Sequence, residues 1–170
     1  MNFSQLSQKR YSVRSYKNDP IEPEKLNEIL EAGRLAPTAC NNQPQKIIVA
    51  RSEEALRWID EATPCRFGAP AVLIVCYDKA KCWSRSFDGE KSGEVDASIV
   101  TSHLMLQAED LGIGSVWVMY FDPKAIIKNF SLDENIVPVA LLPIGYPASD
   151  SAPSDRHGLR NPLESSVAFI

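Results

Sequence analysis

Long hydrophobic runs are missing from this sequence of 170 residues. Its longest apolar stretch, from Ala69 to Tyr77, is far shorter than the about 20 residues that a membrane-spanning helix needs. An apolar signal segment is also missing at the start, where Met1–Gln5 leads directly into mixed polar residues. We therefore expect a cytoplasmic protein without a membrane partner.

An excess of positive charge is missing too. The 18 lysines and arginines are outnumbered by 22 aspartates and glutamates, and the resulting net charge of −4 argues against nucleic acid as a partner. The basic residues are unevenly spread, because Lys9, Arg10 and Arg14 cluster near the start and Arg156 and Arg160 near the end. Two interpretations stay open: solvated surface charges, or two clusters that surround one anion.

Metal-binding spacings are also missing. The sequence has only two histidines, and its four cysteines include no C-x-x-C pair; they are Cys40, Cys65, Cys76 and Cys82. No metal site is expected from such a set. A cytoplasmic location disfavours disulfides, and Cys76, inside the apolar run, is expected to be a buried thiol.

The sequence does contain alternating helix and strand signals that suit one domain, residues 1–170. Helices are expected over residues 2–9, 22–36, 52–62 and 95–111, and a short one after Asp122-Pro123. Strands are expected over residues 46–50, 71–77, 115–120 and 137–144, the last with Pro138 and Pro143 near its ends. Residues 146–170 are expected to form an extended C-terminal arm.

Two details of this pattern bear on function. His103 falls on the apolar face of the 95–111 helix and is expected to be a hydrogen-bonded core residue rather than a ligand. Gly112-Ile113-Gly114 follows a helix and precedes a strand, which is the reverse of the order in a dinucleotide-binding fingerprint. A Rossmann NAD site is therefore excluded.

The segment Arg10-Tyr11-Ser12-Val13-Arg14 has the chemistry of a phosphate cradle. On an extended chain alternate side chains share a face, so Arg10, Ser12 and Arg14 would point the same way. Two guanidiniums beside a hydroxyl suit a phosphate, which arginine binds through paired charged hydrogen bonds. Taken alone the segment is weak evidence, since R-x-S-x-R also occurs by chance.

Three further segments accompany it. The loop from Ala36 to Pro44 joins small residues to asparagine and glutamine amides, which suit the polar edge of a heterocycle, although Asn and Pro are also common in ordinary turns. The segment from Leu111 to Met119 combines a glycine turn with an apolar strand that could lie against a flat ligand or simply belong to the core. Arg160 stands two residues before a late proline, Pro162.

Together and in this order, the four segments resemble the FMN-dependent nitroreductase family, over nearly the whole chain from Lys9 to Val167. The resemblance implies an α+β fold: a three-layer α/β/α sandwich around a mixed, largely antiparallel sheet. It implies that the first segment and Arg160 hold the FMN phosphate and ribityl chain, that residues 37–41 reach the flavin of the other subunit, and that the late strand approaches the ring. The implied FMN-binding residues are Arg10, Tyr11, Ser12, Arg14, Pro37, Thr38, Ala39, Asn41, Val118, Met119 and Arg160.

The sequence departs from the family pattern in three places. Many members have a second basic residue four positions before the late proline, where this chain has Gly158, so Arg156 or His157 substitutes or the contact is missing. Gln45 stands where a tryptophan often follows the Gln-Pro pair. The chain also lacks the longer helical insertion of some members, so residues 82–89 indicate a compact branch whose substrates the sequence does not specify.

The implied function is FMN-dependent oxidoreduction by a homodimer. Hydride would pass from NAD(P)H through FMN to a nitroaromatic, quinone or similar acceptor in a ping-pong cycle, and no catalytic side chain is expected because flavin carries the chemistry. Three alternatives stay open: a flavin enzyme of the same fold with other chemistry, such as dehalogenation or flavin destruction; a non-catalytic flavin-binding protein; and a cofactor-free domain. The sequence does not decide between NADH and NADPH.

Overall fold

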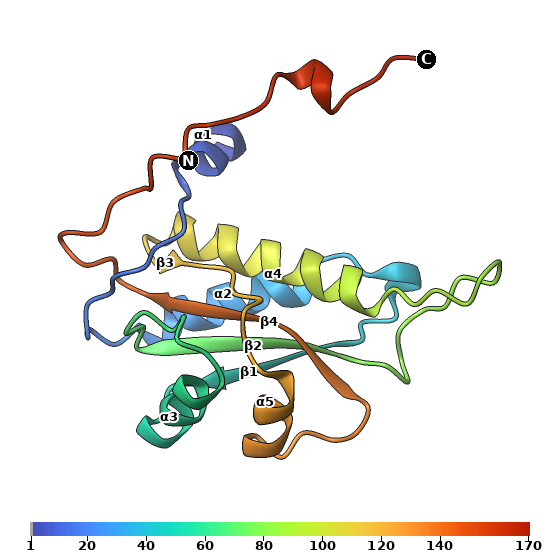
Figure 1. The fold of residues 1–170 in the computed structure, drawn as a ribbon, viewed down its shortest axis with the longest axis horizontal. Helices are drawn as coiled ribbons and strands as arrows, with labels where there is room; N and C mark the ends of the chain where they lie inside the picture. Colours follow the sequence, from blue (N-terminus) through green and yellow to red (C-terminus); the bar gives the residue numbers. More distant parts are fainter. Residues whose placement is uncertain (1) are drawn as a thin grey trace.

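The computed structural model describes residues 2–170 and shows an α+β fold (Figure 1). Its strands are β1 (Gln45–Ala50), β2 (Ala71–Asp78), β3 (Gly114–Ser115) and β4 (Ile136–Gly145). Its α-helices are α1 (Phe3–Lys9), α2 (Pro23–Leu35), α3 (Glu53–Ala62), α4 (Gly93–Asp110) and α5 (Pro123–Asn129). Two short 3-10 helices, η1 (Ala39–Asn41) and η2 (Leu163–Ser165), complete the described elements. Within residues 2–170 no helix is long and apolar enough to cross a membrane.

One antiparallel sheet lies at the centre, with the strand order β1-β2-β4-β3. The expected central strand is confirmed, because β2 pairs with both β1 and β4 and its residues from Ala71 to Cys76 are all buried. Side chains alternate between the two faces of a strand, so an apolar run such as this one serves two cores at once.

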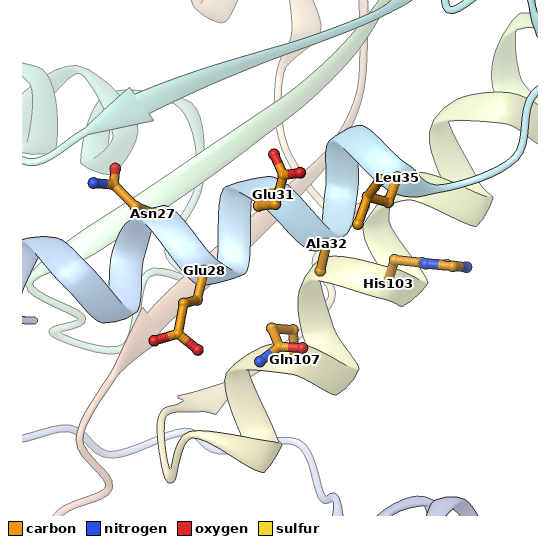
Figure 2. A pocket seen from close by; sticks show the side chains of 7 residues that line it. All are labelled: Asn27, Glu28, Glu31, Ala32, Leu35, His103 and Gln107. Atoms are coloured by element: carbon orange, nitrogen blue, oxygen red, sulfur yellow. The ribbon is translucent and has the colours of Figure 1, made fainter.

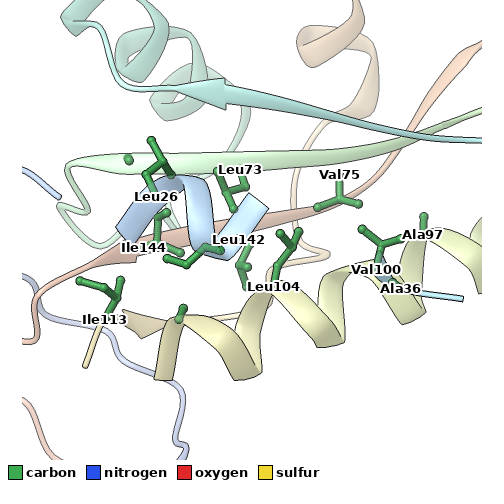
Figure 3. Close-up of a cluster of buried hydrophobic side chains, with 13 residues drawn as sticks. Leu26, Ala36, Leu73, Val75, Ala97, Val100, Leu104, Ile113, Leu142 and Ile144 are labelled. Atoms are coloured by element: carbon green, nitrogen blue, oxygen red, sulfur yellow. The ribbon is translucent and has the colours of Figure 1, made fainter. Parts of the chain in front are cut away.

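Helices cover both faces of the sheet, which confirms the three-layer α/β/α sandwich. On one face Leu73 and Val75 of β2 pack with residues of α2 and α4, including Leu104 (Figure 3). On the other face Val72 and Ile74 pack against α3 and α5. Cys76 belongs to this second core and is fully buried, as expected.

The expected strand over 115–120 is wrong in length, since β3 ends at Ser115. Proline is the reason. The next residue of the segment, Val116, donates to the carbonyl of Pro143 in β4, but Pro143 has no N–H to return the bond. Pairing resumes once, at the bridge between Val118 and Leu141. Both Pro138 and Pro143 lie inside β4 rather than at its ends, and Pro138 sits beside an irregularity in the pairing of β2 with β4.

His103 is a second correction. It is half-buried beside a surface groove, and within residues 2–170 its imidazole forms no hydrogen bond. The fully buried core residues of α4 are Ala97, Val100, Leu104 and Ala108, and the partly buried Ile99 and Met105 pack against the same core. His103 and Gln107 instead line a groove at the surface.

The segment before α2 crosses the end of the sheet as an extended strap, residues 10–17. The Val13 amide donates to the Ser115 carbonyl, and Ser12 forms a parallel bridge with Ser115, the one parallel pairing found among the described residues. The Tyr16 hydroxyl donates to the carbonyls of Val13 and Pro143, and burial raises the pKa of this phenol. Core contacts therefore fix the strap in place.

Residues 146–170 leave the sheet after β4 and run past α1 to a C-terminus that stands away from the body (Figure 1). Most side chains of this segment are exposed, including Phe169 and Ile170.

Candidate cofactor site

A small basic cavity forms where the N-terminal strap meets the C-terminal segment. Its volume is about 150 Å³, well below the roughly 300–1,000 Å³ of sites that enclose a whole drug-sized ligand. It is lined by Arg10, Tyr11, Ser12, Arg14, Ser154, Arg156, His157 and Arg160. The structure thus brings together the two basic clusters that lie about 150 positions apart in the sequence. A cavity of this size suits a single anionic group.

The strap presents its half of the cavity through strand-like alternation. Val13 points into the protein and is fully buried, whereas its neighbours Ser12 and Arg14 face the cavity. The Arg14 guanidinium also donates to the Ser12 carbonyl at 3.4 Å, so the two groups lie close together. The core thus places hydroxyl and guanidinium on one side, as the sequence pattern predicts.

The C-terminal half of the cavity is held against α1 and the strap by polar contacts. The Tyr11 hydroxyl lies 3.2 Å from Ser151 Oγ, and His157 Nε2 lies 3.0 Å from the Gln8 carbonyl oxygen. Arg160 curls back and donates to the carbonyls of His157 and Leu159, both at 2.7 Å. Both residues left open as substitutes for the missing basic position, Arg156 and His157, therefore line the cavity with Arg160.

The charge of this cavity is unbalanced. Four arginines line it, and in the described part of the chain none of them pairs with a carboxylate. Other arginines of the chain do pair, as Arg66 does with Asp60 at 2.6 Å. Guanidiniums gathered without a counter-charge repel each other, so the arrangement fits a bound anion such as a phosphate.

A second group of predicted residues forms a tight loop at Thr38–Gln43. Three of its residues have left-handed backbone conformations although none is glycine: Cys40 (φ 52°), Asn41 (φ 54°) and Gln43 (φ 50°). The Thr38 hydroxyl accepts the Gln43 amide at 3.0 Å and helps to close the turn. Asn41 is exposed, and Pro37 before the loop is exposed as well.

The loop is tied to the start of α4. The Ala39 amide donates to the carboxylate of Asp96 at 2.9 Å, and Asp96 is buried in the first turn of that helix. Sequence reasoning missed Asp96, because its only signal is an acidic residue in a helical first turn, and many helices carry one there.

The third group follows β3. Val118 is buried beside Leu141, whereas Met119 turns outward with 70% of its surface exposed. The neighbouring Trp117 indole N–H is buried without a hydrogen-bond partner in residues 2–170. An exposed methionine on a braced segment provides an apolar surface rather than acid–base chemistry.

The structure keeps the first two of these groups, the strap and the loop, apart within one chain. Lys9, directly before the strap, pairs with Glu109 at the end of α4 at 3.2 Å, and the loop lies at the start of that helix, where the Ala39 amide donates to Asp96. Glu109 is thirteen positions after Asp96 on this helix, which corresponds to about 20 Å along its axis at a rise of ~1.5 Å per residue. The arginine cavity and the loop therefore occupy opposite ends of α4.

A larger surface groove of about 580 Å³ runs between α2 and α4 (Figure 2). Figure 2 shows His103 and Gln107 reaching it from α4 and the other lining side chains, including Glu28 and Glu31, from α2. This groove has no cationic cradle, so it does not match the anion chemistry of the basic cavity.

Comparison with known proteins agrees with this architecture. A family model described as the nitroreductase family matches residues 8–67 and 66–146. The chain is 32% identical to an NADH dehydrogenase of Thermus thermophilus over 87% of this chain and 88% of that protein. It is 31% identical to an FMN reductase (NAD(P)H) of Bacillus subtilis over 85% of this chain and 66% of that protein.

A solved nitroreductase family protein from Clostridium difficile superposes with a TM-score of 0.94 and 43% identity, covering 99% of this chain and 98% of that one. A second one, from Clostridium novyi, gives a TM-score of 0.80 and 26% identity over 88% of this chain and 87% of that one. With the family model matching most of its length and the fold shared throughout, this chain belongs to the nitroreductase family.

Proposed function

We propose that this NAD(P)H-dependent oxidoreductase binds FMN with its phosphate in the basic cavity and works as a homodimer with two shared sites. The observation that carries the proposal is the cluster of four unpaired arginines around Ser12 in one small cavity. Oxidoreduction with NAD(P)H is supported by the names of the relatives described above.

The cavity fits the terminal phosphate of FMN in charge and in donor type. Arginine donates paired, charge-assisted hydrogen bonds to phosphate oxygens, and the Ser12 hydroxyl adds a neutral donor between Arg10 and Arg14. The four larger cavities found in residues 2–170 have no arginine in their lining to take the adenylate part of FAD. We therefore expect FMN to bind in preference to FAD.

Bound FMN would supply the redox chemistry, accepting hydride from NAD(P)H and returning reducing equivalents to a nitroaromatic, quinone or similar acceptor in alternate half-reactions. The chain's own contribution is binding and orientation. Met119 would offer an apolar surface to the ring, with the backbone of the buried Val118 beside it, while the loop at 38–43 would offer amide groups to its polar edge. We expect no side chain of this protein to transfer a proton in the hydride step.

A second copy would complete the site. Because the loop and the basic cavity of one chain lie near opposite ends of α4, we propose that the loop reaches the flavin held by its partner. Exposed apolar side chains such as Met119, Val95 and Leu163 and the groove between α2 and α4 would then be covered in the dimer. An obligate interface of this kind buries upward of about 2,000 Å². A cytoplasmic location, expected from the sequence, remains a prediction.

The proposal is tested by titrating the purified protein with FMN and with FAD while following flavin absorbance and fluorescence. One FMN per chain with weak FAD binding is the expected result. Steady oxidation of NADH or NADPH with a nitroaromatic or a quinone then separates an enzyme from a flavin-binding protein. Protein that stays colourless after addition of FMN would contradict the cofactor assignment.

A further inference from the structure

Asp96 is a carboxylate with an unusual position for a charged group. Only 2% of its surface is exposed, and it lies in the first turn of α4. Its Oδ1 accepts the Ala39 amide at 2.9 Å and its Oδ2 accepts the Ser92 hydroxyl at 2.7 Å. Burial of a carboxylate is costly unless hydrogen bonds and a favourable field offset it, and here two donors and the positive end of a helix do so.

The backbone that Asp96 holds is strained. Ala39 directly precedes two of the three left-handed residues of the loop, Cys40 and Asn41. Conformations of this kind are unfavourable for residues other than glycine and persist only where the surroundings enforce them. The Thr38 hydroxyl supports the loop from within, whereas Asp96 supports it from a core helix.

Asp96 also connects this loop to a second exposed element, the hairpin formed by residues 79–92. The Ser92 hydroxyl donates to Asp96, and the Ser92 backbone amide donates a hydrogen bond to the Trp83 carbonyl at 2.9 Å, which closes the base of the hairpin. The hairpin extends beyond the start of α4 (Figure 1). Near its tip, the pair between Arg85 and Asp88 at 2.6 Å stabilises a turn whose Phe87 is 95% exposed.

We infer that Asp96 is a positioning residue for the flavin site, which fixes the left-handed loop at 38–43 through the Ala39 amide and joins it to the hairpin through Ser92. This inference rests on the proposed function, because the loop acts on the flavin of the partner subunit. Without the Asp96 carboxylate the loop would sample other conformations, and the fraction of protein competent to bind flavin would fall. Apparent affinity falls in proportion to that fraction.

The test compares two substitutions of Asp96 with a matched control. Asp96→Ala removes both acceptors, whereas Asp96→Asn keeps Oδ1 for Ala39 and places an amide beside Ser92, whose hydroxyl can turn to accept. Glu53→Ala removes an exposed acid from the first turn of α3, far from the loop, and controls for the loss of an acidic residue at a helix start.

Two measurements are made on each variant. Amide hydrogen exchange of residues 38–43 is measured without FMN, and the FMN dissociation constant and bound-flavin spectrum are measured by titration. We expect Asp96→Ala to speed exchange in the loop and to raise the dissociation constant about tenfold, the effect of losing roughly 1.4 kcal/mol of bracing. Asp96→Asn should keep the slow exchange of the loop and most of the FMN affinity, and Glu53→Ala should match the unchanged protein in both.

The outcomes distinguish this inference from the proposed function. If the unchanged protein binds FMN and Asp96→Ala shows the exchange and affinity of the control, the positioning role is overturned while the cofactor assignment stands. If the unchanged protein binds no FMN, both fail. Should Asp96→Ala not fold, hydrogen exchange of the Ala39 amide is measured in the unchanged protein instead. An amide held by Asp96 exchanges slowly, so exchange as fast as in an unstructured peptide would overturn the inference.

Discussion

Individual arginines of the basic cavity differ in how firmly they are held, and this difference identifies the most informative one to substitute. Arg160 is fixed by two carbonyls at 2.7 Å, whereas Arg14 is exposed and makes one long contact with the Ser12 carbonyl at 3.4 Å. A substitution of Arg14 therefore disturbs little of the protein itself and reports mainly on what the cavity binds.

We expect Arg14→Ala to weaken FMN binding by roughly 10- to 150-fold. A hydrogen bond to a charged group is worth about 1.5–3 kcal/mol, and each ~1.4 kcal/mol is a factor of ten. The dissociation constant is measured by fluorescence titration. Arg51→Ala, which removes an exposed arginine outside the cavity, is the control and should bind FMN normally. Equal affinity in the two variants would refute the phosphate assignment.

Cys76 provides a pH-dependent prediction about stability. Burial raises the pKa of this thiol from 9.0 to about 12. The folded state holds the thiol proton more tightly than the unfolded state does. The stability that the protonated Cys76 thiol contributes is therefore fully present below pH 9 and is lost as the pH rises from about 9 to 12. The free energy of unfolding is measured with urea at pH 8 and pH 10 under reducing conditions. Between these pH values it should fall by about 1 kcal/mol more for the unchanged protein than for Cys76→Ala. Equal losses would show that the thiol ionises freely in the folded protein.

The side chains of the candidate site were only partly predictable from the sequence. The alternation Arg10-Ser12-Arg14 required only an extended backbone, and the strap provides one. The choice between Arg156 and His157 could not be made, because the tight turn at residues 155–158 brings both to the cavity and no pattern in the sequence encodes that turn. Asp96 could not be found, since its burial depends on a loop more than 50 positions away.

At the scale of elements, α4 connects the two ends of the site, and its packing against β2 depends on Gly93. This residue opens α4, and a Cβ atom placed on it would overlap the ring of Tyr77. We expect Gly93→Ala to lower the free energy of unfolding by about 1–3 kcal/mol, since overpacking outweighs the gain in helix propensity of up to ~1 kcal/mol. Urea denaturation measures the change.

The control for this substitution is Gly158→Ala, because nothing lies within 4 Å of a Cβ atom at that position. It should leave stability within about 0.5 kcal/mol of the unchanged protein, as most surface substitutions do. A Gly93→Ala protein as stable as this control would mean that the Tyr77 ring moves aside freely and that the contact does not fix the start of α4.

Element positions followed from periodicity wherever a core decided them, as in β2 and α4. The predictions were wrong at a proline in the neighbouring strand and at a helix face that lines a surface groove. The strand expected to reach Tyr120 pairs only to Ser115, because Pro143 cannot return a hydrogen bond to Val116. His103 matched an apolar helical face, yet it lies at a groove on the surface of this chain. A single sequence does not distinguish a face that packs on its own core from one that a second copy would cover.

At the scale of the whole molecule, the proposed sites require two chains for a geometric reason. The basic cavity and the left-handed loop lie near opposite ends of α4, whose residues Asp96 and Glu109 are about 20 Å apart along the helix axis. In a symmetric dimer the same interface occurs twice, so each cavity would face the loop of the partner and two equivalent sites would result.

A mixed dimer tests this arrangement directly. One chain carries Arg14→Ala, which damages its cavity, and the other carries Asp96→Ala, which damages its loop. Co-expression with two different affinity tags isolates the mixed species. If sites are shared, the cavity of the Asp96→Ala chain meets the intact loop of the Arg14→Ala chain, so one of the two sites is native and the other carries both changes.

FMN titration of this mixed dimer should therefore show one site of unchanged affinity and one that is strongly weakened. Each parent homodimer should show two equivalent sites with a single defect. If instead each chain builds its site alone, the mixed dimer has one site with each defect, and no site binds as tightly as in the unchanged protein. Recovery of native affinity from two impaired chains thus requires a flavin held between them, whereas its absence would refute the shared site.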